Sequence, residues 1–170
     1  MELHLDGVRR WARREPDWAA AAVSGFAAGA VLMVLELLWA GATGANVWDA
    51  SHRIAAILVG PHVLEYTSSS FGVGLAALAT HYALGIGFGF LTGFLLARLR
   101  LDGALAVALA AGAVIGLLLY FVDFHLMTRF FPWMTAMRGG STILAHLVFG
   151  MVTAGLYWVL RRGPRARWQH

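Results

Sequence analysis

The sequence predicts an all-α integral membrane protein, built as a bundle of four spanning helices. Of its 170 residues, 59% are hydrophobic and 13% are charged, and the mean hydropathy is +0.68. This composition excludes a soluble globular domain and a disordered chain, and the absence of cysteine excludes a disulfide scaffold and a thiol enzyme. Four apolar stretches also have about the 20 residues that a helix needs to cross the hydrocarbon core of a bilayer.

The four predicted spans cover residues 18–41, 71–97, 105–127 and 142–160. No linker and no shift in composition divides the chain, so we expect residues 1–170 to form a single domain. A short connection at residues 98–102 joins the second and third spans, which predicts that these two helices are antiparallel neighbours.

The first and third connections are expected to lie at the membrane surface. Residues 46–66 predict a short interfacial helix that ends before Pro61, because apolar side chains recur there at helical spacing opposite polar ones. These apolar side chains are Trp48, Ile54, Ile57 and Leu58. Residues 129–140 contain three closely spaced aromatic side chains and are expected to form an aromatic loop in the outer headgroup layer.

The positive charge of the chain predicts its orientation. All 13 basic residues are arginines, and ten of them lie in the two tails and the second connection: Arg9, Arg10, Arg13, Arg14, Arg98, Arg100, Arg161, Arg162, Arg165 and Arg167. Short cytoplasmic segments retain positive charge, so we expect a bacterial inner-membrane protein with both termini in the cytoplasm. Because these arginines flank membrane spans, we expect the lipid bilayer as a partner and no nucleic acid.

Two pairs of similar stretches indicate an internal repeat. Residues 27–31 and 110–114 both read Ala-Ala-Gly-Ala-Val, and the pattern His-x-x-x-Gly begins at His81 and again at His146. They predict two helical hairpins of the same polarity, related by an approximate two-fold axis along the membrane normal. Chance coincidence of alanine and glycine runs in apolar sequence is the alternative.

Each predicted span carries one ionisable side chain on the face that holds its small residues. At about 100° of rotation per residue, these side chains are Glu36, His81, Asp123 and His146. The helical rise places Glu36, Asp123 and His146 roughly 6–8 Å below the outer membrane boundary. Because ionisable groups inside a bilayer are costly, we expect all four to face the bundle interior and one another.

Four interpretations of this set stay open. The first is structural, with salt bridges or His–carboxylate hydrogen bonds that fix the helix register. The second takes all four side chains as ligands of Zn, Fe or Mn. The third takes His81 and His146 as axial ligands of a b-type haem, with Gly85 and Gly150 making room for the macrocycle. The fourth is a proton relay or a quinone contact through Glu36 and a histidine.

Three further histidines are expected to lie outside this site. His125 follows Asp123 by two residues and therefore points about 160° away from it on a regular helix. His52 and His62 belong to the first connection, where solvated interfacial positions are the expectation.

Three features of the sequence carry a resemblance to a known group of proteins. They are the Arg53-Ile-Ala-Ala stretch, the positions of His81 and His146 near the starts of their spans, and the four-span layout. The chain resembles a group of small bacterial inner-membrane proteins that are sometimes labelled sodium:proline symporter-like, although they are far shorter than that transporter. The likeness covers residues 20–160 and implies a four-helix bundle. It implies no catalytic residue.

The sequence favours a non-catalytic membrane subunit or accessory protein of a larger membrane complex, for instance a respiratory one. Short connections and the exposed aromatic side chains of residues 130–133 motivate this hypothesis, with other membrane subunits or further copies of the chain as partners. The alternative is a metal- or haem-binding redox or ion-handling protein with its site near the periplasmic face. A transporter or channel ranks third, because the ionisable groups occupy only the outer half and form no continuous polar path.

Overall fold

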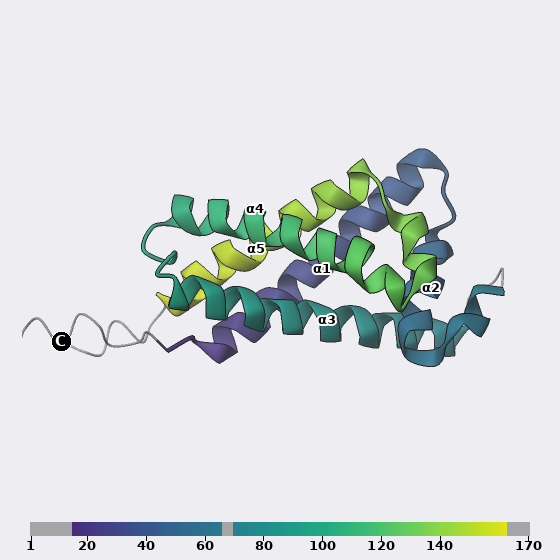
Figure 1. Cartoon of the computed structure of the whole chain (residues 1–170), viewed down its shortest axis with the longest axis horizontal. Helices are drawn as coiled ribbons and strands as arrows, with labels where there is room; N and C mark the ends of the chain where they lie inside the picture. Colours follow the sequence, from purple (N-terminus) through teal and green to yellow (C-terminus); the bar gives the residue numbers. More distant parts are fainter. Residues whose placement is uncertain (1–14, 66–69, 163–170) are drawn as a thin grey trace, which may run out of the picture.

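The computed structural model describes residues 15–65 and 70–162, and every regular element in these ranges is helical. Its longer helices are α1 (Trp18–Thr43), α2 (Val47–Val59), α3 (Phe71–Arg98), α4 (Leu105–Phe121) and α5 (Gly140–Arg161) (Figure 1). Four helical segments are long and apolar enough to cross a membrane, and their ends lie within two residues of the predicted spans. The predicted all-α four-helix membrane bundle is therefore confirmed.

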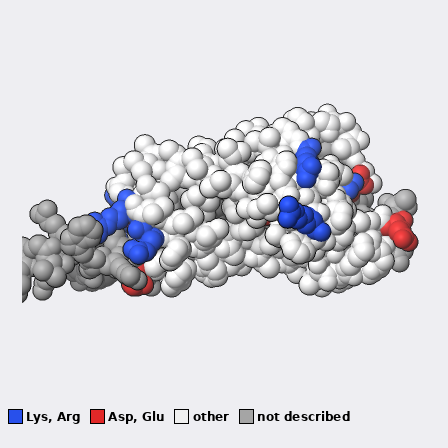
Figure 2. All heavy atoms as spheres, in the orientation of Figure 1, with Lys and Arg blue, Asp and Glu red and all other residues white. Residues whose placement is uncertain are grey.

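The distribution of charge agrees with a membrane belt around the bundle. On the face shown in Figure 2, Lys, Arg, Asp and Glu side chains gather towards the two ends of the elongated molecule, and the middle carries none of them. One end carries α2, and we call it the α2 end. The turn between α3 and α4 lies at the opposite end. Each end thus has the polar surface that a membrane–water boundary requires.

Local capping explains where the helices of the first half begin and end. The side chain of Asp17 accepts a hydrogen bond from the amide of Ala20 at the start of α1, and Asn46 caps α2 in the same way. Gly44 ends α1 in the left-handed conformation, with φ 72°. The helix predicted in the first connection is confirmed as α2, which ends before Gly60 and Pro61, whereas its position at the membrane interface stays a prediction.

The four long helices form two tightly packed pairs, α1 with α3 and α4 with α5. In the first pair, a β-carbon added to Gly25 would lie 2.8 Å from the α-carbon of Gly89. In the second pair, a β-carbon added to Gly150 would lie 2.9 Å from the α-carbon of Gly116. Helix backbones therefore meet directly in both pairs, as small residues allow in lipid.

The expectation that the second and third spans are neighbours is wrong. The turn of residues 99–104 does connect α3 to α4 in antiparallel order, but the two helices scarcely touch. The glycine face of α3 packs against α1, and the glycine face of α4 packs against α5. A tight connection makes the two helices antiparallel, but it does not determine which helices they pack against.

The two pairs repeat one another, with a register that differs from the one predicted. Gly25 faces Gly85 as Gly112 faces Gly150. Gly25 is thus the equivalent of Gly112, which shifts the predicted match between residues 27–31 and 110–114 by one helical turn. The Ala-Ala-Gly-Ala-Val string that the two stretches share predicts the wrong register. It shows only that these residues are small, and it does not determine which residues of the neighbouring helix they contact.

This corrected register makes the acidic residues equivalent. Glu36 follows Gly29 by seven residues, and Asp123 follows Gly116 by seven residues. Each pair of helices therefore contributes one carboxylate and one histidine at matching positions.

The helix that follows Phe121 widens into a π-helical turn, Val122–Leu126, and then tightens into a 3₁₀ turn, Met127–Arg129. A regular helix was expected to run to residue 127. In the wide turn, the carbonyl of Phe124 accepts a hydrogen bond from Nε of Arg138 at 2.6 Å. Turns of this kind are frequent at functional sites.

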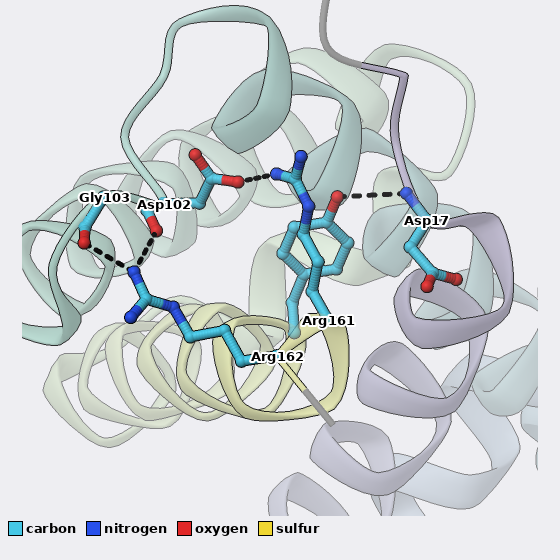
Figure 3. A network of polar contacts seen from close by, with 6 residues as sticks. Asp17, Asp102, Gly103, Arg161 and Arg162 are labelled. Carbon is cyan, nitrogen blue, oxygen red and sulfur yellow. Dashed lines mark hydrogen bonds and ion pairs between the residues drawn. The ribbon is translucent and has the colours of Figure 1, made fainter. Parts of the chain in front are cut away.

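A network of polar contacts ties the helices together at the end opposite α2 (Figure 3). Arg161 at the end of α5 forms an ion pair with Asp102 in the α3–α4 turn, and Arg162 donates to the carbonyl of Asp102 at 3.3 Å. The hydroxyl of Tyr157 accepts from the amide of Asp17 at 3.2 Å. The start of α1, the α3–α4 turn and the end of α5 are therefore held together.

At the α2 end, α2 and the 3₁₀ helix Pro132–Met137 cover the bundle. The Trp133 indole donates to the carbonyl of Arg53 at 3.0 Å, and Arg53 donates to the carbonyl of Trp133 at 3.2 Å. The predicted aromatic loop is thus partly packed onto α2, while Phe130 remains 70% exposed.

Candidate functional site

All four ionisable residues singled out by the sequence line one cavity at the α2 end, which we call the four-helix cavity. Its volume is about 70 Å³. Glu36 comes from α1, His81 from α3, Asp123 from the π turn and His146 from α5. The remaining lining residues are apolar: Gly29, Leu32, Ile54, Ile57, Leu84, Gly85, Phe88, Phe124, Met134, Met137 and Phe149.

Asp123 and His146 form the closest pair in this cavity. Nε2 of His146 lies 3.6 Å from a carboxylate oxygen of Asp123, and Nδ1 of His146 lies 2.9 Å from the carbonyl oxygen of Thr142. The contact with a carbonyl requires a hydrogen on Nδ1. In a neutral ring, Nε2 then presents a lone pair to the carboxylate. That arrangement is repulsive unless a proton or another cation lies between the two atoms.

His81 occupies the equivalent position in the other helix pair. Its Nε2 donates to the carbonyl of Gly29 at 2.8 Å, and its ring meets Tyr82 edge to face at 5.4 Å between centroids. In a neutral ring, this bond leaves Nδ1 as an acceptor with a lone pair. Both histidines are therefore oriented by backbone carbonyls, and each is left with one nitrogen able to bind a cation.

Glu36 lies between the two pairs of helices. It interacts electrostatically with His81 and with His146, and it is partly buried. Within residues 15–65 and 70–162, no arginine lines the cavity. Two carboxylates consequently face two imidazoles with no permanently charged cation in the lining.

The structure offers no preformed shell of three or more metal ligands within residues 15–65 and 70–162. Asp123 and His146 are the closest donors, and a four-ligand shell requires Glu36 and His81 to turn their side chains towards them. The four-residue metal site stays a prediction.

The haem interpretation expected free space beside Gly85 and Gly150, but neighbouring helices occupy it. A β-carbon on Gly85 would lie 3.0 Å from the carbonyl oxygen of Gly25, and one on Gly150 would lie 2.8 Å from the amide nitrogen of Gly116. Because these glycines contact neighbouring helices, that part of the haem interpretation is wrong.

The other histidines differ in how well their placement was anticipated. His125 is exposed and stacks on Phe121 with 5.1 Å between ring centroids, pointing away from the cavity as its spacing predicted. His62 is exposed as well. His52 was expected to be solvated, but it is only 4% exposed and its Nδ1 lies 2.8 Å from the carbonyl oxygen of Trp48. Its helix, α2, packs onto α3 through Ala55, Ala56, Ala76 and Ala77.

An apolar layer closes the four-helix cavity on the side away from α2. Phe88 and Phe149 meet edge to face at 6.4 Å between centroids, and Ile115, Leu119 and Ala28 pack in the same cluster. Sequence reasoning missed this floor, since nothing distinguishes these side chains from lipid-facing ones without knowing which helices pair.

Sequence reasoning also missed the cover of the cavity. Ile54 and Ile57 belong to the apolar face of α2 that was assigned to the membrane interface, whereas both line the cavity. Met134 and Met137 join them from the 3₁₀ helix Pro132–Met137. The helical spacing in residues 46–66 did reveal an apolar face, which is the signal that could have suggested a cover.

No protein-family model, curated protein or solved structure matches this chain. The resemblance to small sodium:proline symporter-like membrane proteins therefore stays a prediction, and the site itself must carry the functional argument.

Proposed function

We propose that this chain is an integral membrane protein that binds a cation in the four-helix cavity. The observation that carries the proposal is the pairing of Asp123 with His146. A carboxylate oxygen and an imidazole nitrogen face one another 3.6 Å apart, and the hydrogen on the other ring nitrogen is committed to Thr142. A cation between the two atoms would turn this repulsive arrangement into an attractive one.

The donors in the cavity fit a divalent transition-metal ion. Imidazole nitrogens and carboxylate oxygens are the ligands of Zn²⁺, Fe²⁺ and Mn²⁺. The hydrogen bonds from ring nitrogens to the carbonyls of Gly29 and Thr142 resemble the outer-shell bonds that orient metal-binding histidines. A bound divalent ion would also balance the charges of Glu36 and Asp123, which is a strong requirement inside a membrane.

We expect ligands to reach the cavity from the α2 end. Glu36 lines the four-helix cavity and also a larger pocket that opens at this end. Phe88 and Phe149 close the other side. The geometry therefore supports binding from one side of the membrane, and it favours a binding protein over an open channel.

Metal binding gives the first prediction. We expect the full chain, purified in detergent and stripped with a chelator, to take up about one Zn²⁺ or Mn²⁺ ion per molecule, measured by elemental analysis after dialysis. Asp123→Asn and His146→Gln should each weaken binding at least about tenfold, because each removes one of the two closest donors.

The matched control is His125→Gln, which changes a histidine two residues from Asp123 that points away from the cavity. It should bind metal as the unchanged chain does. Metal well below one ion per chain in the unchanged protein would contradict the proposal, and so would equal losses in the His125 and His146 variants. A Soret band in the visible spectrum would instead support the haem interpretation of His81 and His146.

We also propose that the protein lies in a bacterial inner membrane, with the α2 end on the periplasmic side and both termini in the cytoplasm. Arginine placement supports this orientation. Because the chain has no cysteine, single introduced cysteines can test it. We expect Thr135→Cys to react with a membrane-impermeant maleimide in intact cells, and Gly103→Cys to react only after permeabilisation. Both positions are exposed, so the reverse labelling pattern would overturn the orientation.

A non-catalytic role within a larger membrane complex stays a prediction. The aromatic side chains that motivated it are only partly available, because the indole of Trp133 is bonded to α2. Binding of a cation is compatible with such a role, since a subunit of a complex can carry its own site.

A further inference from the structure

A second pocket, which we call the α1–α5 pocket, opens at the α2 end beside the four-helix cavity. Its volume is about 380 Å³, which lies in the range of small-molecule sites. The end of α1, the start of α2 and the segment that leads into α5 line it. Its charged lining residues are Glu36, Asp49, Arg53 and Arg138. Of these four, only Glu36 also lines the four-helix cavity.

The two arginines of this pocket have N–H donors that form no hydrogen bond within the part of the chain that the structure describes. Arg53 uses one nitrogen on the carbonyl of Trp133, and Arg138 uses two, on the carbonyl of Phe124 and the hydroxyl of Thr128. Each guanidinium has five N–H donors. In the part of the chain that the structure describes, neither guanidinium forms an ion pair with a carboxylate. Two such guanidinium groups in one pocket favour a phosphate group, which they can bind bidentately.

The carboxylates of the pocket favour a cationic group on the same ligand. Asp49 precedes Arg53 by four residues on α2, so the two lie on one face of that helix. Asp49 is exposed and has no side-chain bonding partner within residues 15–65 and 70–162. A purely anionic ligand would meet Asp49 and Glu36 as repulsive neighbours, whereas a zwitterionic ligand would satisfy both signs of charge.

The pocket also has an exposed apolar wall. Trp39 near the end of α1 is 56% exposed, and Leu144 in the first turns of α5 is 61% exposed. Both line the pocket, and they lie within the last five residues of the first candidate membrane span and the first five residues of the last. An amphiphile can therefore rest its acyl chains on these side chains while its polar group enters the pocket.

We propose that the α1–α5 pocket binds the headgroup of a zwitterionic phospholipid that carries a primary ammonium group, such as phosphatidylethanolamine. Arg53 and Arg138 bind the phosphate, and Asp49 accepts hydrogen bonds from the ammonium. A trimethylated headgroup lacks the N–H donors that a carboxylate binds, and a glycerol headgroup lacks the positive charge. The site is therefore selective for the ammonium lipid over both.

The experiment presents the purified full chain with an equimolar mixture of phosphatidylethanolamine, phosphatidylglycerol and phosphatidylcholine, and measures retained lipid by native mass spectrometry. We expect the chain to retain about tenfold more phosphatidylethanolamine than either other lipid, because one charge-assisted hydrogen bond separates them. Asp49→Asn should abolish this preference, because it lowers retention of phosphatidylethanolamine and removes one repulsive charge from the site for phosphatidylglycerol. Arg53→Lys combined with Arg138→Lys should lower retention of all three lipids.

The control variant is Arg129→Gln, which changes an exposed arginine at the same end that does not line the pocket. It should behave as the unchanged chain does. Equal retention of the three lipids, a preference that survives Asp49→Asn, or an equal loss in the Arg129 variant would each overturn the proposal. Competition by free phosphoethanolamine without retention of any lipid would assign the pocket to a soluble ligand and overturn it too.

Failure of this proposal can be told apart from failure of the proposed function. Asp49, Arg53 and Arg138 do not line the four-helix cavity, so Asp49→Asn should leave metal binding unchanged. Asp123→Asn should likewise leave lipid retention unchanged, because Asp123 does not line the α1–α5 pocket.

Discussion

We expect Gly150→Val to force α4 away from α5 and to destroy the folded bundle. A β-carbon at this position would overlap the carbonyl oxygen of Gly112 and lie 2.8 Å from the amide nitrogen of Gly116. Both are backbone atoms of α4, which cannot move aside as a flexible side chain can. Overpacking in cores costs about 1–3 kcal/mol and more where relaxation is blocked. A loss of about 3 kcal/mol or more should appear in the free energy of unfolding, measured by titration with a denaturing detergent.

The matched control is Gly87→Ala on α3. A β-carbon added there meets nothing within 4 Å, and alanine favours a helix by about 1 kcal/mol over glycine. This variant should be as stable as the unchanged chain or slightly more so. If Gly150→Val unfolds at the same detergent fraction as Gly87→Ala, the close α4–α5 contact does not hold the bundle together.

The existence and limits of the spanning helices could be predicted from the sequence. Hydropathy is a property of each segment by itself, and a bilayer demands about 20 apolar residues of every span. The end of α2 was predictable for a similar reason, because Pro61 and the preceding glycine act locally. Neither prediction needs any knowledge of which segments pack together.

The four ionisable residues of the four-helix cavity could also be predicted from the sequence. Glu36 and Asp123 each lie seven residues after a glycine that packs against a neighbouring helix, which places both on the inner faces of their helices. The cost of exposing a carboxylate to lipid makes that inner face the only stable choice. Helical periodicity and desolvation together were enough to bring the acids and histidines to one cavity.

The pairing of the helices could not be predicted, because the glycine stripes are interchangeable. Gly85 and Gly89 on α3 could meet the small residues of α4 as readily as those of α1 by composition alone. The choice between partners depends on how side chains interlock along the full length of both helices. The one-turn error in the repeat alignment has the same cause.

The π turn at Asp123 could not be predicted from the sequence either. Arg138, fifteen residues after Asp123 in the chain, donates a hydrogen bond to the carbonyl of Phe124 within this turn. A regular helix satisfies its own backbone, so the sequence around Asp123 predicts a regular helix and does not indicate this distant hydrogen bond. The sequence contains both residues but no local signal that joins them.

We expect Phe149→Ala to lower the free energy of unfolding by about 2 kcal/mol. Phe149 is 3% exposed and packs against Phe88 beneath the four-helix cavity. Loss of a phenylalanine ring costs about 3–5 kcal/mol in soluble cores. The cost should be smaller here because the unfolded chain places the ring in apolar lipid or detergent rather than water. Unfolding by detergent titration measures it, with Phe94→Ala, at a 43% exposed position, as the control that should cost little.

The same substitution shows whether the floor of the cavity matters for the site. Removing the ring opens space below Asp123 and His146, and water that enters there weakens the attraction between the bound cation and its ligands, because local dielectric screening rises. We therefore expect Phe149→Ala to bind metal more weakly although it removes no ligand, and Phe149→Leu, which keeps most of the volume, to bind nearly as the unchanged chain does. If both variants keep full affinity, the apolar floor serves packing alone. If both lose affinity equally, the ring itself is required, and exclusion of water does not explain its role.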